Sequence, residues 1–356
     1  MMTHAELRAR IEEIIRTSLS TSSWLTPSDE DIWKSFSTHA YTHSVGGKMT
    51  RSYLINIAAN MGTCTQQTIV HAGAAFELFQ ASALVHDDII DNSPLRRGHD
   101  SAHISFAREH EKNQWLASSH HFGLSSAITL GDYLLPLSFE HMLNATEHLS
   151  SQQQKKILHV FSSMMCEVAY GQFLDIRAEN IPHQDYETAH HNAINVLLHK
   201  SARYSVEMPL YLGALLGGLS DETCHHIQRI GHHLGIAFQL RDDALGVFGD
   251  PQTTGKPACS DIQEGKKTLL VALVRKNLAH TDQKQLDWFD QHYGITLDQK
   301  DLKTMLHIID NSGACSEHEK IITMHEDTAQ DLIDALPIER KDELSAIAQQ
   351  LSQRNK

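Results

Sequence analysis

Cysteine is scarce in this chain, with five residues in 356, and no two of them form a CxxC pair. An odd number of widely separated cysteines is typical of reduced thiols, so we expect no disulfides and a cytoplasmic protein. The five residues are Cys64, Cys166, Cys224, Cys259 and Cys315.

Long hydrophobic runs are missing as well. No stretch reaches the roughly 18 uninterrupted apolar residues of a membrane-spanning helix. The first 20 residues place acids within an amphipathic pattern and lack an apolar core segment, which is typical of a folded helix rather than a signal peptide. We therefore expect no membrane span and no leader.

Positive charge is in short supply, because 30 lysines and arginines face 44 acids and leave a formal net charge of −14. Nucleic acids are bound through basic patches, so this balance argues against a nucleic-acid partner. The cations that do cluster are local exceptions and point to a smaller anionic ligand.

Linkers rich in glycine, serine or proline are absent, and strand-like alternation is rare. Helical apolar periodicity recurs along the chain, and 41% hydrophobic residues suffice for a sizeable core. We therefore predict an all-α fold and a single domain over residues 1–356.

Two aspartate pairs stand at the ends of apolar segments, where negative charge is unexpected. Asp87 and Asp88, with Asp91, close a helical run over residues 69–90. Carboxylates near a helix C-terminus oppose the macrodipole, so a cation must compensate them. Because Asp87 and Asp91 are i and i+4, they share one helix face, whereas Asp88 lies about 100° round.

Acids in this arrangement suit Mg²⁺, which takes one or two carboxylates together with substrate phosphates. Arg96 and Arg97 follow directly in the turn NSPLRRG, and arginine grips phosphate in bidentate fashion. The second pair, Asp242 and Asp243, is likewise trailed by cations at Lys256, Lys266 and Lys267. One such pair alone is usually a solvated face, but two with the same surroundings predict a diphosphate site.

These residues belong to a larger ordered set of motifs between about Gly46 and Leu270 that resembles the trans-isoprenyl diphosphate synthases of the polyprenyl synthetase family. The matching residues are Gly46, Gly47, Lys48 and Arg51 in GGKxxR, Gln80, Asp87, Asp88 and Asp91 in DDxxD, Arg96, Arg97 and Gly98 in RRG, Gly131, Asp132, Gln172, Asp175, Lys200, Ser201, Gln239, Asp242 and Asp243. Met49 and Ser52 replace the arginine and proline often found in the first motif. The resemblance implies an isoprenoid-synthase helical bundle around a central cavity, and a homodimer.

The second aspartate motif departs from the family pattern, because Gly246 occupies its last acidic position and the next acid is Asp250. This puts in doubt a direct metal role for that position. Asp242 remains the expected ligand, with Asp243 supporting it through water or hydrogen bonds.

By resemblance, the chain condenses isopentenyl diphosphate with an allylic diphosphate by ionisation, condensation and elimination. About three Mg²⁺ ions would be held by Asp87, Asp91 and Asp242. The residues expected on the allylic diphosphate are Arg96, Lys200 and Lys256, those on isopentenyl diphosphate are Lys48, Arg51, Gln80 and Arg97, and those around the carbocation are Lys200, Ser201 and Gln239. Lys266 is also expected to bind substrate.

Product length is expected to depend on residues that precede the first acids. Ser82 and Ala83 are small and would let a growing chain pass, whereas Phe79 lies about 4.5 Å further along the helix, with Phe76 behind it. This pattern predicts geranylgeranyl diphosphate, with a farnesyl or longer product as the alternative. The two phenylalanines are equally compatible with ordinary core packing.

Three other functions remain open. A class I terpene cyclase also uses an acid-rich helix, but its second motif should resemble NDxxSxxxE. An HD-type phosphohydrolase would use His86 as a metal ligand, together with a separate histidine and aspartate. A non-catalytic helical subunit that regulates a synthase is the third, and turnover by the purified chain alone would exclude it.

Overall fold

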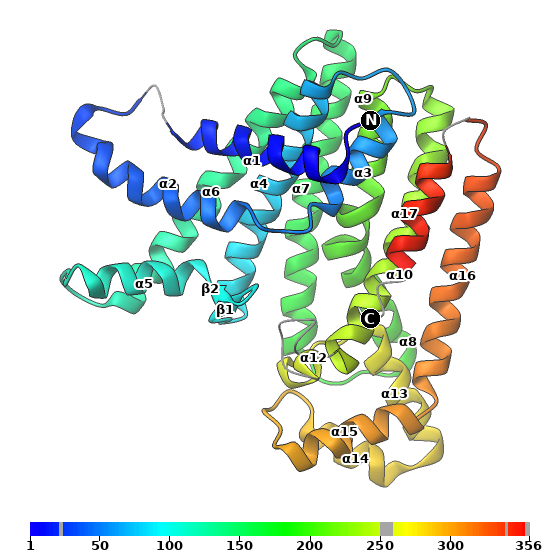
Figure 1. The fold of residues 1–356 in the computed structure, drawn as a ribbon. Helices are drawn as coiled ribbons and strands as arrows, with labels where there is room; N and C mark the ends of the chain where they lie inside the picture. The colour runs from blue at the N-terminus through cyan, green and yellow to red at the C-terminus, as the bar shows by residue number, and fades with distance from the viewer. Residues whose placement is uncertain (21–23, 250–258, 339–340, 353–356) are drawn as a thin grey trace. The chain divides into compact units, whose positions relative to one another are not determined.

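The computed structural model of the chain describes residues 1–20, 24–249, 259–338 and 341–352, and helices form most of them (Figure 1). In these ranges the strands are two short segments, β1 (Leu95–Arg96) and β2 (His99–Asp100), which pair antiparallel with Arg96 opposite His99. The predicted all-α fold is confirmed.

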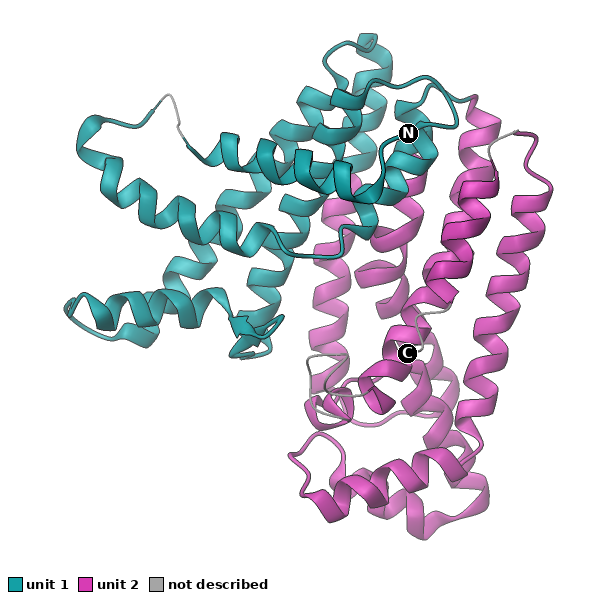
Figure 2. Ribbon diagram, in the orientation of Figure 1, with its two compact units in different colours: residues 1–162, 212–219 teal, residues 163–211, 220–356 magenta. Residues whose placement is uncertain are grey.

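Two compact units make up the chain (Figure 2). Unit 1 comprises Met1–Ser162 and Leu212–Leu219, and unit 2 comprises Ser163–Tyr211 and Ser220–Lys356. Each unit has its own cluster of buried apolar side chains. The single domain expected over residues 1–356 stays a prediction.

Unit 1 is built around the α4 and α6 helices. Its elements are α1 (His4–Ser20), η1 (Pro27–Asp29), α2 (Glu30–Ser44), α3 (Thr50–Ala59), α4 (Gln66–Ile90), β1, β2, α5 (Ala102–Lys112), α6 (Ser119–Thr146), the first part of α7 (Ser151–Asn180) and the end of α9 (Met208–Leu216). One stripe of α1 enters this core through Leu7, Ile11, Ile15 and Leu19, which recur every four residues.

The α4 helix carries the first aspartate pair, and its start is fixed by Thr65, whose side chain accepts a hydrogen bond from the amide of Thr68 at 3.1 Å. Residues along most of its length are buried, including Phe76 and Leu78 at 0% exposure. By length and composition alone α4 could cross a membrane, but most of its apolar window is packed inside the protein, as in a core helix. It is therefore weak evidence for a membrane span.

Unit 2 holds the second aspartate pair on the long helix α10. Its elements are the rest of α7, α8 (Tyr186–Val196), the π-helix η2 (Leu197–Glu207), the start of α9, α10 (Asp221–Phe248), α12 (Ser260–Glu264), α13 (Leu269–Thr281), α14 (Gln283–His292), α15 (Gln299–Asn311), α16 (Ala314–Asp334) and α17 (Asp342–Ser352). The core of this unit joins α10 to α13 and α16 through residues such as Leu240, Leu273 and Ile322.

Several histidines are buried in these cores, which makes stability sensitive to acid. His141 on α6 is 2% exposed, and its two ring nitrogens contact His71 at 3.1 Å and the Ser18 hydroxyl at 2.9 Å. Burial, reinforced by His71, lowers the pKa of His141 to about 4. The unfolded chain therefore binds a proton at this residue between pH 6.5 and 4 that the folded chain does not.

Stability should accordingly fall as the pH drops below about 6.5, by up to about 1.4 kcal/mol per pH unit for each such histidine. Between pH 7 and pH 5, the free energy of unfolding should fall by about 2 kcal/mol less in a His141→Asn variant than in the parent. Urea unfolding at both pH values measures this difference. The His148→Asn variant, at an exposed position, serves as the control. If the unfolding free energy of His141→Asn depended on pH as much as that of the parent, the assignment would be contradicted.

Candidate active site

The first aspartate cluster lies at the C-terminus of α4, as predicted. The helix ends at Ile90, and Asp91 caps it by donating its amide hydrogen to the carbonyl of Asp87 at 2.8 Å. Asp87 and Asp91 are half-buried, whereas Asp88 is 2% exposed. The helix thus presents Asp87 and Asp91 on one accessible face and turns Asp88 inward.

Asp88 is bound by Arg96 of β1. The Arg96 Nε donates to Asp88 Oδ1 at 2.9 Å, and its Nη2 contacts the same oxygen. Burial opposes the charge of Arg96, but the Asp88 carboxylate outweighs this effect and raises the pKa of Arg96. Arg96 Nη2 also lies 3.6 Å from Asp87 Oδ2. Asp88 therefore holds a charged guanidinium beside Asp87, and its catalytic role stays a prediction.

Arg97 reaches the loop that carries the Gly-Gly-Lys motif. Its backbone is left-handed, with φ of 54°, and its Nη1 donates to the carbonyl of Val45 at 2.9 Å. A Cβ on Gly47 would lie 2.8 Å from Arg97 Nη2, so the guanidinium packs directly against the backbone of Gly47. Lys48, the next residue in the loop, is exposed.

A buried acid lies behind these cations. Glu77 of α4 is 3% exposed and accepts a hydrogen bond from the Ser52 hydroxyl at 2.6 Å. Burial raises the pKa of Glu77, opposed by Ser52 and by the charges of Arg51 and Arg97. Arg51 and Arg97 are thus brought together around Glu77 in unit 1, while Gln80 is half-buried one turn beyond Glu77 on α4.

Burial also lowers the pKa of Arg97, even though Glu77 raises it, and the neighbouring charges of Arg96, Arg51 and Arg8 lower it further. Cations crowded this way favour an anion with several negative oxygens. The site therefore suits a diphosphate group.

The residues expected to control product length lie in the interior of unit 1. Ser82 is 1% exposed and donates its hydroxyl hydrogen to the carbonyl of Gly131 on α6 at 2.8 Å, while Ala83 is half-buried. The rings of Phe76 and Phe79 have centroids 5.4 Å and 6.4 Å from that of Phe161 on α7. An aromatic cluster thus lies on α4 beyond the small residues, on the side away from Asp87. Phe161 belongs to this cluster, although sequence spacing did not indicate it.

His86, the residue that suggested a phosphohydrolase, faces α6. Its Nε2 lies 3.4 Å from the carbonyl of Ile128 and 3.5 Å from Asp132 Oδ1. A Cβ on Gly131 would come within 2.4 Å of the same nitrogen. The imidazole therefore fills space that Gly131 leaves open between the two helices.

In unit 2, Lys200 lies in the π-helix η2 and its ammonium donates to Asp175 Oδ2 of α7 at 2.5 Å. The backbone of η2 approaches α7 so closely that a Cβ on Gly171 would lie 2.3 Å from the Lys200 amide nitrogen. π-Helical turns occur frequently at functional sites. Gly171 and Asp175 together fix the position of Lys200 and its neighbour Ser201.

The second aspartate pair lies near the C-terminus of α10. Asp243 accepts a hydrogen bond from Gln239 Nε2 at 3.0 Å, and its supporting role toward Asp242 stays a prediction. Burial raises the pKa of Asp243 to about 8; Gln239 and Lys266 oppose this shift, whereas the charges of Asp261 and Asp242 reinforce it. Negative charge thus accumulates around Asp243 beyond what one lysine offsets.

Asp261 supplies an acid at the place where the family pattern has its last aspartate. A Cβ on Gly246 would lie 1.9 Å from Asp261 Oδ2, so the α12 carboxylate occupies the space that a side chain at position 246 would need. Whether a residue at this place binds metal stays open, but a carboxylate does lie there. The sequence signal was the acid in SDIQEGK, 15 residues further along the chain than Gly246.

The trailing lysines have separate positions. Lys266 Nζ lies 2.8 Å from Glu264 and 4.0 Å from Asp261 Oδ1, so it belongs to the acid cluster. Lys267 Nζ donates instead to the carbonyl of Ile181, at the end of α7. Lys256 and Asp250 lie outside the described residues.

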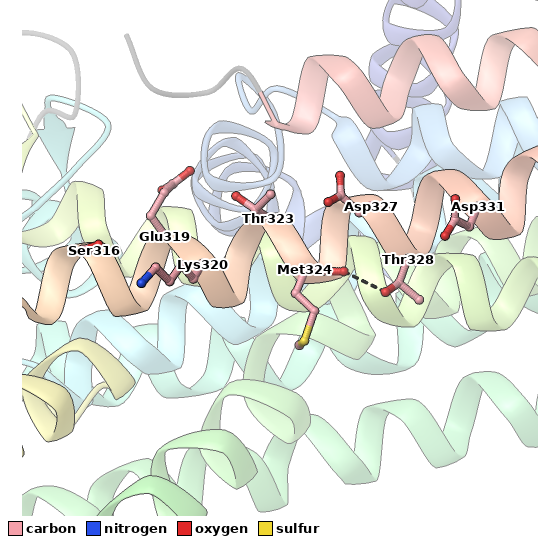
Figure 3. Close-up of a pocket in the computed structure, with 8 residues that line it drawn as sticks. All are labelled: Ser316, Glu319, Lys320, Thr323, Met324, Asp327, Thr328 and Asp331. Atoms are coloured by element: carbon pink, nitrogen blue, oxygen red, sulfur yellow. Dashed lines mark hydrogen bonds between the residues drawn. The ribbon is translucent and has the colours of Figure 1, made fainter.

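A cavity of about 670 Å³ runs along α16 (Figure 3). Its lining comes from a single helix: Ser316, Glu319, Lys320, Thr323, Met324, Asp327, Thr328 and Asp331. Met324 is 56% exposed. The cavity is thus a trough on the surface of one helix, and none of the described site residues predicted from sequence lines it.

The donor chemistry of both acid clusters fits Mg²⁺. In the described ranges, histidine, cysteine, aspartate and glutamate side chains nowhere gather in threes close enough to hold a metal by themselves. Mg²⁺ usually takes one or two carboxylates and completes its shell with water and phosphate oxygens. Paired acids beside arginine and lysine side chains meet that requirement.

Comparison with known proteins decides the family. The model of the polyprenyl synthetase family matches residues 35–309, well over half of the chain. The chain belongs to the polyprenyl synthetase family. This confirms the family and the short-chain trans-prenyltransferase class predicted from the motifs.

Individual members of the polyprenyl synthetase family resemble the chain over most of its length. The geranylgeranyl diphosphate synthase of Sulfolobus acidocaldarius is 30% identical over 72% of this chain and 71% of its own. The geranylfarnesyl diphosphate synthase of Aeropyrum pernix is 29% identical over 82% and 84%. A crystal structure of geranylgeranyl pyrophosphate synthase from Corynebacterium glutamicum, complexed with isoprenyl diphosphate and magnesium, has a TM-score of 0.87 and 30% identity over 99% of this chain and 98% of that one.

Proposed function

We propose that the chain condenses isopentenyl diphosphate with an allylic diphosphate, with Mg²⁺, and that geranylgeranyl diphosphate is its main product. The observation that carries this proposal is in unit 1. The accessible acids Asp87 and Asp91 end the same helix that carries Glu77, whose pKa is raised by burial and lowered by the nearby charges of Arg51 and Arg97. The proposed metal-binding acids and the proposed diphosphate-binding arginines therefore gather around one helix, α4.

Mg²⁺ would be held by Asp87 and Asp91 in unit 1 and by Asp242 in unit 2, with Asp243 and Asp261 completing the second acid cluster. About three ions would be bound, as expected from the family resemblance. When bound, the metal would neutralise diphosphate oxygens and stabilise the charge that develops on the leaving group. The magnesium in the Corynebacterium glutamicum synthase supports this proposal.

The cations of unit 1 offset the repulsion between two diphosphates. Unit charges 4 Å apart interact by roughly 4 kcal/mol at an effective dielectric near 20, so uncompensated substrates would not bind together. Lys48, Arg51, Gln80 and Arg97 would bind isopentenyl diphosphate, and Arg96 would bind the allylic diphosphate beside Asp87. Because these groups are positioned before the reaction begins, they stabilise the transition state, in which negative charge grows on the leaving group, more than the ground state.

In unit 2, Lys200 would bind the allylic diphosphate, together with Lys256 and Lys266. Ser201 and Gln239 would line the carbocation left when the allylic carbon–oxygen bond breaks. Asp175 orients Lys200, and Asp243 orients Gln239, so each group has a fixed direction. The acids need not transfer protons, since the released diphosphate accepts the proton lost in the final elimination.

Phe79 tests the proposed limit on product length. A Phe79→Ala variant should make products longer by at least one isoprene unit, because truncation opens space beside Phe161. Phe79 is 3% exposed, so the variant should also lose roughly 3 kcal/mol of stability. Chromatographic sizing of the products measures the shift.

Phe106→Ala on α5 is the matched control, because Phe106 is 4% exposed and packs on His39 at a centroid distance of 4.0 Å. It should lose stability and keep the parent's product length. An unchanged product distribution in Phe79→Ala would assign Phe79 to the core alone.

We also propose a cytoplasmic homodimer, as the family resemblance implies. The five cysteines are all free, which suits a reducing compartment. On the surface of α6, Ile128 is 46% exposed and Leu143 is 42% exposed, so this helix offers apolar side chains to a second copy.

Turnover by the purified chain tests the proposed function. The full chain is incubated with Mg²⁺, labelled isopentenyl diphosphate and, in turn, dimethylallyl, geranyl and farnesyl diphosphate, and the products are sized. Geranylgeranyl diphosphate is the expected product. A farnesyl or longer main product would correct the proposed length, and failure to elongate any primer would favour a regulatory subunit.

A further inference from the structure

The N-terminal helix α1 holds the Gly-Gly-Lys loop through two side chains one helical turn apart. Arg8 Nη2 donates to the carbonyl of Gly47 at 2.6 Å, and the His4 Nε2–H donates to the carbonyl of Lys48 at 2.8 Å. Residues i and i+4 lie on the same helix face, so α1 binds two consecutive carbonyls at once. Neither residue belongs to a family motif recognised in the sequence.

The loop needs such support because its backbone is unusual. Gly46 has φ of 82°, and Met49 has φ of 50°, a left-handed conformation that is costly for a residue with a side chain. Met49 is 3% exposed, so burial holds its side chain while α1 holds the carbonyls just before it. The exposed Lys48 therefore lies between Gly47, whose carbonyl is bound by α1, and the buried Met49.

The anchor itself is rigid. The neighbouring stripe of α1, with Leu7 and Ile11 at 1% and 0% exposure, is buried in the core of unit 1. Arg8 is further oriented by Glu12, whose carboxylate lies 3.2 Å from its Nε. The Arg8 charge also acts on Arg97, which contacts the other side of the same loop.

We propose that Arg8 and His4 are positioning residues for isopentenyl diphosphate, because they fix the loop that presents Lys48. This inference rests on the proposed function, since it names the substrate of that site. It places the determinant of one diphosphate subsite in α1, more than 35 residues before the motif it serves.

An Arg8→Met variant should bind isopentenyl diphosphate roughly 5- to 20-fold more weakly, the range expected for losing a charge-assisted hydrogen bond on a partly exposed side chain. The KM for the allylic substrate should change less than about two-fold. Arg8→Lys keeps the charge and one donor, so it should recover most of the affinity. Calorimetry with isopentenyl diphosphate alone gives the dissociation constant without requiring turnover.

Arg10→Met is the matched control, because Arg10 lies on the same helix and donates to Gln66 Oε1 at 2.7 Å, away from the loop. It should leave both constants unchanged. Parent-like affinity in Arg8→Met, or an equal rise of both KM values, would overturn the inference. If Arg8→Met fails to fold, Arg8→Gln is measured in its place with the same criterion. A parent that binds isopentenyl diphosphate but does not elongate it would count against the proposed function alone.

Discussion

An Asp87→Asn variant should turn over roughly 10²- to 10³-fold more slowly than the parent at saturating Mg²⁺, the loss typical of removing one group that stabilises transition-state charge. Asp87 lies on the accessible face of α4, and Arg96 Nη2 is 3.6 Å from its Oδ2. Little of the fold depends on this contact. The melting temperature should therefore stay close to that of the parent, as differential scanning fluorimetry would show.

Asp88→Asn provides the contrast within the same motif. Asp88 is 2% exposed and carries the hydrogen bonds from Arg96, so the amide would remove the nearest counter-charge of the half-buried guanidinium. We expect a loss of roughly 2 to 4 kcal/mol in the free energy of unfolding. Equal stability losses in the two variants would show that the inward and outward acids are not distinguished as the structure indicates.

Restoring the usual family acid should damage the second cluster. In Gly246→Asp, the new Cβ would lie 1.9 Å from the present position of Asp261 Oδ2, so the Asp261 carboxylate would have to move. A further negative charge would also be added beside the half-buried Asp243. Groups that orient metal ligands typically contribute 10- to 100-fold to activity or metal affinity, and we expect a loss of about that size in kcat.

The reciprocal change supplies the control. In Gly246→Asp/Asp261→Gly, the carboxylate returns to α10, where position 246 is i+4 from Asp242 and shares its face. The double variant should recover much of the activity that each single variant loses, which Mg²⁺ titration of kcat would measure. Additive losses in the double variant would rule out an exchange of roles between the two positions.

Much of the fold and part of the site could be predicted from the sequence. Helical periodicity and the motif spacing placed Asp87 and Asp91 on one face at the end of α4, because both depend only on local helix geometry. The same geometry put Asp88 about 100° away, but it could not reveal that this direction meets Arg96 in a buried pair. That contact depends on how the β1–β2 turn folds back.

Contacts between distant segments explain the remaining differences. The approach of Asp261 to Gly246 depends on the path of the chain between α10 and α12, which no local pattern records. Ser82 looked like a small residue beside a growing product, whereas its hydroxyl is bonded to Gly131 of α6. Arg8 had no signal, because an arginine on an amphipathic helix is ordinary until its partner is known.

The π-helix η2 constrains the length of the chain as well as its residues. A π-helical turn contains more residues than an α-helical turn, so loss of one residue within Leu197–Glu207 would let the segment rewind as an ordinary helix. Each residue removed rotates the C-terminal part of the helix by about 100° relative to the N-terminal part. Lys200 could then no longer keep both its backbone contact with Gly171 and its bond to Asp175. We therefore expect that insertions and deletions, which surface loops tolerate, would displace Lys200 when they fall within this segment.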